Sequence, residues 1–182
     1  MKHLLILTIM AVLMMPVVAT AQNDKQNDKK KSLSQGDNRI KAAEGAGSAS
    51  SLFVPEEIRN AFPTAESTKE EGMLRAVYAE GKLLGYALYS KPASDGIKGY
   101  AGETPLLIAL TPEKTVLSVQ MLPNQETPNI AEKVRKSTLL QSWNGLTLKK
   151  ARKKRVDAVS GATYTSKSVI KSLRAAVKKA QK

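Results

Sequence analysis

The stretch PLLIALTPEKTVLSVQML, which runs from Pro105 to Leu122, contains two short apolar segments separated by a turn. Residues 105–110 are continuously apolar, as in a strand that is covered on both faces. Thr111-Pro112-Glu113-Lys114 is a turn sequence. The segment after it alternates, which places the following apolar residues on one side of a second strand: Leu117, Val119 and Met121. The stretch therefore predicts two neighbouring strands of a hairpin.

The flanking sequence extends this pattern on both sides. Upstream, residues 73–80 and 83–90 are predicted strands joined at Gly81-Lys82, and "VPEEIRNAF" before them predicts a short helix that ends at Pro63. Downstream, helices are predicted after Pro128, before Gly145 and from about Thr165. Strands follow one another as hairpins and do not alternate with helices. The fold class is therefore α+β: one domain with a twisted, mainly antiparallel sheet, flanking helices and a long C-terminal helix.

The N-terminal segment predicts export. Lys2 precedes an almost wholly apolar run, and Ala19-Thr20-Ala21 is a small-residue cleavage pattern, so residues 1–21 are a predicted signal peptide. The polar and basic composition of residues 22–51 predicts a disordered linker, and residues 52–182 form the predicted domain. The expected location is periplasmic or otherwise extracytoplasmic, with membrane association if the signal is not cleaved.

Composition excludes several kinds of chemistry. The chain has no Cys, and its one His is His3, inside the predicted signal. A typical zinc or copper site, a Ser-His-Asp triad and a thiolate nucleophile are therefore excluded from the domain. Hard metals bound by oxygen ligands remain open, but we assign no metal site and no catalytic residue. The formal net charge of +13 favours an anionic partner. Because export argues against nucleic acid, we expect that partner to be an anionic lipid, an acidic redox protein or an anionic cofactor.

The segment DAVSGATYTSKSVI, from Asp157 to Ile170, combines small residues, hydroxyls and the start of a helical pattern. Gly161 and Ala162 let the backbone come close to a ligand, and a helix start offers free N–H groups to an anion. Ser160, Thr163, Thr165 and Ser166 add hydroxyl donors. The segment therefore predicts a phosphate site, and the alternative is an ordinary helix cap.

This segment resembles the attachment motif of the FMN-binding domain family, which occurs in extracytoplasmic subunits of the sodium-pumping NADH:quinone oxidoreductase and of the Rnf complex. The family pattern of Asp, two variable positions, Ser or Thr, Gly, Ala and Thr is matched from Asp157 to Thr163. The resemblance implies that Thr163 carries FMN through a phosphoester bond, made by a separate flavin transferase that uses FAD. It also implies that Asp157, Ser160, Gly161 and Ala162 shape the phosphate pocket and the transferase recognition site.

Two further segments support the resemblance, which extends over roughly residues 74–178. "GYAG", from Gly99, resembles the Gly-Tyr-Gly-Gly stretch of the family, and "NQETP", from Asn124, resembles its Glu-Thr-Pro loop. Glu126 and Thr127 are accordingly expected at the flavin, with capping of the next helix as the alternative. Tyr100 either stacks on the ring or packs. Asn129-Ile130-Ala131 stand where family members often have Gly-Leu-Gly, so we expect the backbone to approach the ring less closely.

The resemblance implies an electron-transfer flavoprotein, rather than a self-contained enzyme, that works outside the cytoplasmic membrane. Its partners would be the flavin transferase and a redox partner protein or membrane reductase. Two alternatives remain: a flavinylated subunit of a larger membrane reductase, and a cofactor-free module that binds anionic surfaces. The basic run "KKARKKR", residues 149–155, is either a solvated surface or the binding element of such a module.

Overall fold

The computed structural model describes residues 50, 51 and 53–182. The predicted signal peptide and nearly all of the predicted linker lie outside these residues. Ser50 and Ser51, the last two residues of that linker, form a short strand. Within the described part of the chain, no helix has both the length and the apolar character needed to cross a membrane.

The sheet has six strands, arranged in chain order and antiparallel throughout. The strands are β1 (Ser50–Ser51), β2 (Ser67–Glu71), β3 (Leu74–Ala79), β4 (Lys82–Tyr89), β5 (Leu106–Leu110) and β6 (Val116–Met121). Strand β5 is buried along its whole length. Its side chains alternate between two cores: Leu106 and Ile108 belong to one, and Leu107 and Ala109 belong to the other.

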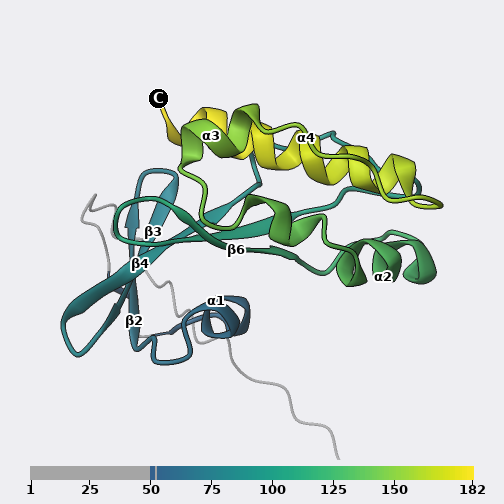
Figure 1. Ribbon diagram of the computed structural model, residues 1–182. Coiled ribbons are helices and arrows are strands. Elements are labelled where there is room, and N and C mark those ends of the chain that lie inside the picture. The colour runs from purple at the N-terminus through teal and green to yellow at the C-terminus, as the bar shows by residue number, and fades with distance from the viewer. Residues whose placement is uncertain (1–49, 52) are drawn as a thin grey trace, which may run out of the picture. The chain divides into compact units, whose positions relative to one another are not determined.

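Helices cover both faces of the sheet (Figure 1). They are α1 (Glu56–Ala61), α2 (Pro128–Lys136), the short 3₁₀ helix η1 (Leu140–Trp143), α3 (Leu148–Lys153) and α4 (Thr163–Ala180). One core joins the sheet to α2, η1, α3 and α4, and the fully buried Trp143 lies in it. The smaller core joins the other face to α1 through Ile58 and Phe62. The α+β class, the antiparallel sheet and the long C-terminal helix are thereby confirmed.

The structure corrects the predicted face of Leu117 and adds two elements, β2 and α3 (Leu148–Lys153), that were not predicted. Leu117 does not share a face with Val119: it is 44% exposed, and Val116 takes the core position. The register between β5 and β6 shifts between Ala109 and Leu110, so one residue of β6 is left over in the pairing. Strand β2 was not predicted, because its sequence STKEE carries no apolar alternation. Helix α3 was not predicted either, although it includes much of the basic run.

Candidate functional site

Three segments that are distant in the sequence meet at the buried carboxylate of Glu126, which is only 5% exposed. It accepts hydrogen bonds from the backbone N–H groups of Ala101 at 3.2 Å and Gly102 at 3.5 Å. The Thr165 hydroxyl, from the first turn of α4, donates to the same carboxylate at 3.1 Å. Glu126 therefore connects the "GYAG" loop, the "NQETP" loop and the start of α4.

Gly99 makes this meeting possible. A Cβ atom built on Gly99 would overlap the Oε1 atom of Glu126 and would also crowd the backbone of Thr165. The loop can approach the carboxylate this closely only because the side chain is absent. The glycine of "GYAG" thus has a local packing reason in this chain.

Two other buried hydroxyls of α4 are also occupied by protein contacts. The Ser166 hydroxyl accepts a hydrogen bond from the Val159 N–H at 3.0 Å and donates to the Ala162 carbonyl at 2.8 Å, which closes the turn before the helix. The Ser168 hydroxyl lies 2.6 Å from that of Thr104, just before strand β5. Ala162 is the N-cap residue, and no side-chain cap bond is formed there. These hydroxyls therefore tether α4 to its neighbours and do not act as N-caps.

Ser160, Gly161 and Thr163 form the exposed side of the same turn. Within residues 53–182, neither the Ser160 nor the Thr163 hydroxyl has a hydrogen-bond partner in the protein. Gly161 has a φ angle of +73°, which few residues other than glycine adopt readily. The geometry leaves the Thr163 hydroxyl open to a reagent from solvent.

An open, mainly apolar hollow of about 240 Å³ lies beside Thr163. Two tyrosines line it and are themselves largely exposed: Tyr100 is 64% exposed and Tyr164 is 68% exposed. Ile130, on the first turn of α2, lines it as well. Exposed aromatic rings beside an apolar surface suit a flat aromatic ligand. A larger, more polar hollow of about 390 Å³ involves Gly102 and Gln125, but no residue of the 157–166 turn.

Lys133 on α2 also reaches this turn. Its amino nitrogen lies 3.0 Å from where a Cβ on Gly161 would stand. Among the described residues it forms no ion pair, whereas its neighbours Arg135 and Lys136 both pair with Glu132. An unpaired ammonium beside a helix N-terminus is a favourable place for a phosphate.

The loop that carries "GYAG" is also held at its base by an exposed ion pair. Lys91 Nζ lies 2.6 Å from Glu103, which in turn accepts the Gly96 N–H at 2.7 Å. The hydrogen bonds from Lys91 and from the Gly96 backbone hold the pKa of Glu103 below its ordinary value. The hydrogen bond to Glu103 raises the pKa of Lys91.

The comparison with protein families gives this turn its chemical context. Residues 99–178 match the family described as the FMN-binding domain. This part of the chain, less than half of it, is similar to the FMN-binding domain family. The match contains all three segments that meet at Glu126, and it starts at Gly99, later than the resemblance from residue 74 suggested.

Several curated proteins are similar to this chain over parts of their length. The chain is 33% identical over 96 residues to a subunit of the proton-translocating ferredoxin:NAD(+) oxidoreductase complex of Clostridium ljungdahlii, covering 49% of this chain and 51% of that protein. It is 33% identical over 89 residues to a subunit of the ion-translocating oxidoreductase complex of Shewanella piezotolerans, covering 43% of this chain and 42% of that protein. The corresponding protein of Shewanella oneidensis is 28% identical over 143 residues, covering 69% of this chain and 67% of that protein. The chain spans about half the length of the first two relatives.

The residues beside Thr163 fit an FMN group by their chemistry. The apolar hollow suits the ring system, and the bare Gly161 backbone with the Lys133 ammonium suits the phosphate. Of the predicted site residues, the structure places Ser160, Gly161, Ala162, Thr163, Thr165 and Tyr100 at or beside this hollow. Asp157 lies instead in a basic groove with Arg155 and Lys167.

The two residues predicted to contact the ring, Glu126 and Thr127, have these positions in the structure. Glu126 directs its carboxylate to the internal hydrogen bonds described above, and Thr127 is the N-cap residue of α2, without a side-chain cap bond. Sequence reasoning missed Lys133 and Ile130 as neighbours of the turn formed by residues 160–163. Their spacing of three residues on one helix face was the available signal, but nothing in the sequence shows which face α2 turns to residues 160–163.

Proposed function

We propose that this protein carries FMN covalently on Thr163 and transports electrons with it. The observation that carries the proposal is the exposed, unbonded Thr163 hydroxyl, set at the start of α4 beside an apolar hollow in an FMN-binding domain. The neighbouring hydroxyls of Thr165 and Ser166 are buried and already bonded. Thr163 is therefore the hydroxyl best presented to another protein.

Attachment requires an external enzyme, because a Thr hydroxyl is a weak nucleophile and the domain has no His to activate it. We propose a flavin transferase with FAD as donor. The Thr163 oxygen forms an ester bond to the phosphorus of the FMN half, and the bond between that phosphorus and the AMP oxygen breaks. AMP leaves, and the hydroxyl proton is released. When bound, a flavin accepts and donates one or two electrons.

The protein supplies the surroundings for the flavin. Lys133 and the N–H groups at the start of α4 offset the negative charge of the phosphodiester, while Ile130, Tyr100 and Tyr164 provide apolar surface at the ring. Glu126 acts indirectly on the flavin, because it fixes the relative positions of the two loops and α4. Ring orientation therefore depends on a carboxylate that faces the protein interior.

The names of the relatives support a place in a larger assembly. Each of the three proteins compared above is named as a component of an ion-translocating or proton-translocating oxidoreductase complex. We propose that this chain likewise passes electrons to or from a redox partner protein or membrane reductase. In keeping with the N-terminal sequence, we place this activity outside the cytoplasmic membrane.

The proposal is tested by producing the protein together with a flavin transferase and comparing wild type with Thr163→Ala. We expect the intact mass of the wild type to increase by one FMN phosphoester, with flavin fluorescence that survives denaturing electrophoresis. The variant should show neither while it remains folded by circular dichroism. A wild type without flavin, despite an active transferase that modifies a control substrate, would refute the covalent attachment.

A further inference from the structure

Helix α4 carries a row of cations that begins one turn after the attachment residue. Thr163, Lys167, Lys171, Arg174 and Lys178 follow one another at intervals of three or four residues, so they lie along one face of the helix. The three lysines are exposed. Arg174 is half-buried and donates to the Lys154 carbonyl at 2.9 Å, which links the row to the basic segment after α3.

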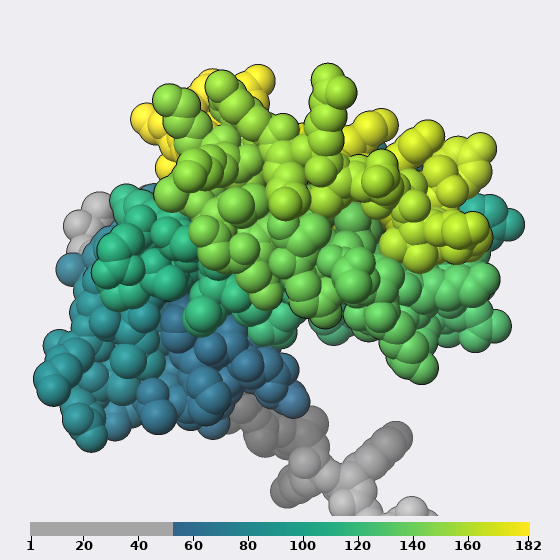
Figure 2. All heavy atoms as spheres, viewed as in Figure 1, coloured from purple at the N-terminus to yellow at the C-terminus, as the bar shows by residue number. Residues whose placement is uncertain are grey.

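The surface between α4 and that segment is hollowed. A groove of about 340 Å³ is lined by cationic and apolar residues. The cations are Arg155, Lys167, Lys171 and Arg174, and the apolar residues are Val156 and Ile170. Asp157 is the one acidic residue in the groove. Figure 2 shows long side chains standing out from the neighbouring surface over α3.

These charges do not stabilise the fold through ion pairs. Residues 133–182 contain fifteen Lys or Arg and one acid, Asp157, whereas residues 53–132 contain seven Lys or Arg and eleven Asp or Glu. Among the described residues no ion pair involves α3 or α4. Like charges on neighbouring helices repel one another, so the concentration of cations costs stability. A binding role explains why they are gathered on this face.

The face is suited to a protein more than to a bilayer. Peripheral membrane helices place large apolar side chains among their cations and insert them into the bilayer. The exposed large apolar residues of the described chain are Phe53, Tyr100, Leu117 and Tyr164. None lies on α3, and α4 has only Tyr164, which lines the hollow beside Thr163. A groove lined by four cations also matches carboxylates that project from a folded surface.

We propose that the cationic row and groove of α4 form the docking surface for an acidic electron-transfer protein. The inference rests on the proposed function, because the row starts next to the residue that would hold the flavin. A partner with a negatively charged surface around its redox group would be attracted to this face at long range. It would then settle with that group near Thr163.

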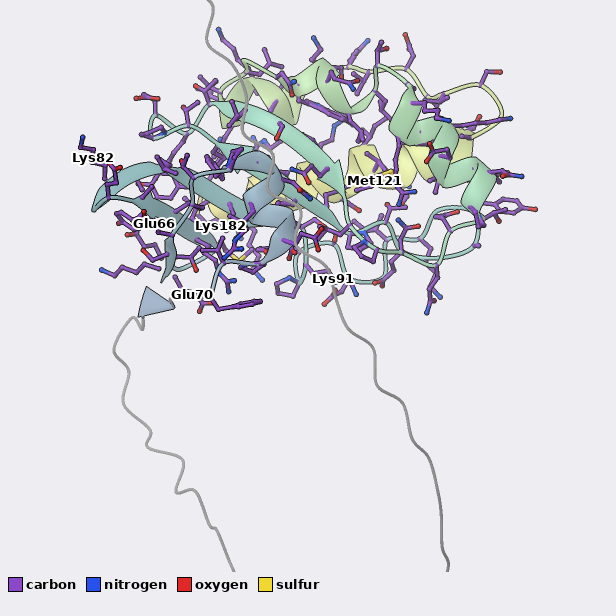
Figure 3. All side chains as sticks on the ribbon, turned by 90° about the horizontal axis from the view of Figure 1, so that it is seen from below. Glu66, Glu70, Lys82, Lys91, Met121 and Lys182 are labelled. Carbon is purple, nitrogen blue, oxygen red and sulfur yellow. The ribbon has the colours of Figure 1, made fainter. Side chains whose placement is uncertain are left out.

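The test uses an acidic flavodoxin as the protein probe and phosphatidylglycerol vesicles as the lipid probe. The test variant is Lys167→Gln/Lys171→Gln, which leaves the Arg174 hydrogen bond in place. The matched control is Arg59→Gln/Lys82→Gln, which removes the same charge from α1 and from the outer end of the β3–β4 hairpin, where Lys82 points to solvent (Figure 3). Binding is measured by fluorescence anisotropy at low and at physiological ionic strength.

We expect the α4 variant to bind flavodoxin about tenfold more weakly at low ionic strength, and the control to change by less than about threefold. We also expect the wild-type affinity to fall steeply with salt. Equal weakening by both variants would show attraction by net charge alone and would overturn the docking surface. Tighter, row-dependent binding to the vesicles than to flavodoxin would overturn it in favour of a membrane surface.

Measuring flavin content and flavodoxin binding on the same protein preparations separates this inference from the proposed function. Row-dependent flavodoxin binding by a protein that carries no flavin even as wild type would support the surface and refute the attachment. A flavinylated wild type whose flavodoxin affinity is unchanged by Lys167→Gln/Lys171→Gln would support the attachment and refute the surface.

Discussion

The hydroxyls at the start of α4 fall into two groups that differ in what they contact. Thr165, Ser166 and Ser168 are buried, and each has a protein partner. Ser160 and Thr163 are exposed, and neither has a partner within residues 53–182. The comparison teaches that a motif rich in hydroxyls need not use all of them on a ligand. One group holds α4 and the turn before it in place, and the other is left without a protein partner in the described chain.

The largest loss of folding stability should come from removing the Glu126 carboxylate, which accepts the Thr165 hydroxyl. Glu126→Ala leaves two backbone N–H groups and the Thr165 hydroxyl without their acceptor, so we expect the free energy of unfolding to fall by about 2–4 kcal/mol. Urea denaturation measures this directly. Glu132→Ala, which removes a surface carboxylate from α2, should cost less than about 1 kcal/mol. Similar losses in the two variants would contradict the role of Glu126 as an internal anchor.

A smaller loss of folding stability should distinguish Ser166, which is bonded, from Ser160, which is exposed. Ser166→Ala removes one accepted and one donated hydrogen bond, and should lower the free energy of unfolding by about 1–2 kcal/mol. Ser160→Ala removes an exposed, unbonded hydroxyl and should change it by less than about 0.5 kcal/mol. The comparison would fail if Ser160→Ala proved as destabilising as Ser166→Ala.

Substituting Lys133 tests whether the surroundings of Thr163 favour a phosphate. Lys133→Gln should slow flavin incorporation by the transferase about twofold to fivefold, because an ammonium beside the new phosphodiester is lost. Its folding stability should stay unchanged. Lys136→Gln on the same helix is the control, since Lys136 pairs with Glu132 instead. Phosphorus NMR of the loaded proteins gives a second readout: the resonance should shift in Lys133→Gln only. An unshifted resonance there would place Lys133 away from the phosphate.

The smallest effect concerns the exposed carboxylate at the base of the "GYAG" loop. The pKa of Glu103 is lowered in the folded protein, so its pair with Lys91 contributes stability above the ordinary Glu pKa and loses it as the pH falls through the lowered value. We therefore expect opening-limited hydrogen exchange at the Gly96 amide to lose protection, relative to the core, only in acid. In Glu103→Gln the protection should be lower at neutral pH and show no such acid step. A wild type without the step would contradict the assignment.

Sequence patterns predicted the parts of the fold that follow from local apolar spacing. The alternating cores of β5, the hairpin of β3 and β4 and the apolar face of α4 all arise from such spacing. Strand β2, with the sequence STKEE, has no such pattern, although it pairs with β3 along its whole length. Leu117 was misplaced because a register shift between strands leaves no mark in the residue pattern.

The site was predictable in its segments but not in its contacts. The resemblance to the FMN-binding domain identified the three segments that meet around Glu126, and the family match contains them all. It could not show that this carboxylate faces inward, because that depends on the close approach of Gly99. It also could not bring Lys133 to Gly161, since their contact depends on how α2 and α4 pack.

The most direct test of the account is to locate the flavin within one peptide. Trypsin would release residues 156–167 as a single fragment, which contains both groups of hydroxyls except Ser168. Tandem mass spectrometry of this fragment from the transferase-treated protein should place the FMN phosphoester on Thr163 alone. A phosphoester on Ser160, Thr165 or Ser166 would contradict the division between hydroxyls that build the turn and the one that carries the flavin.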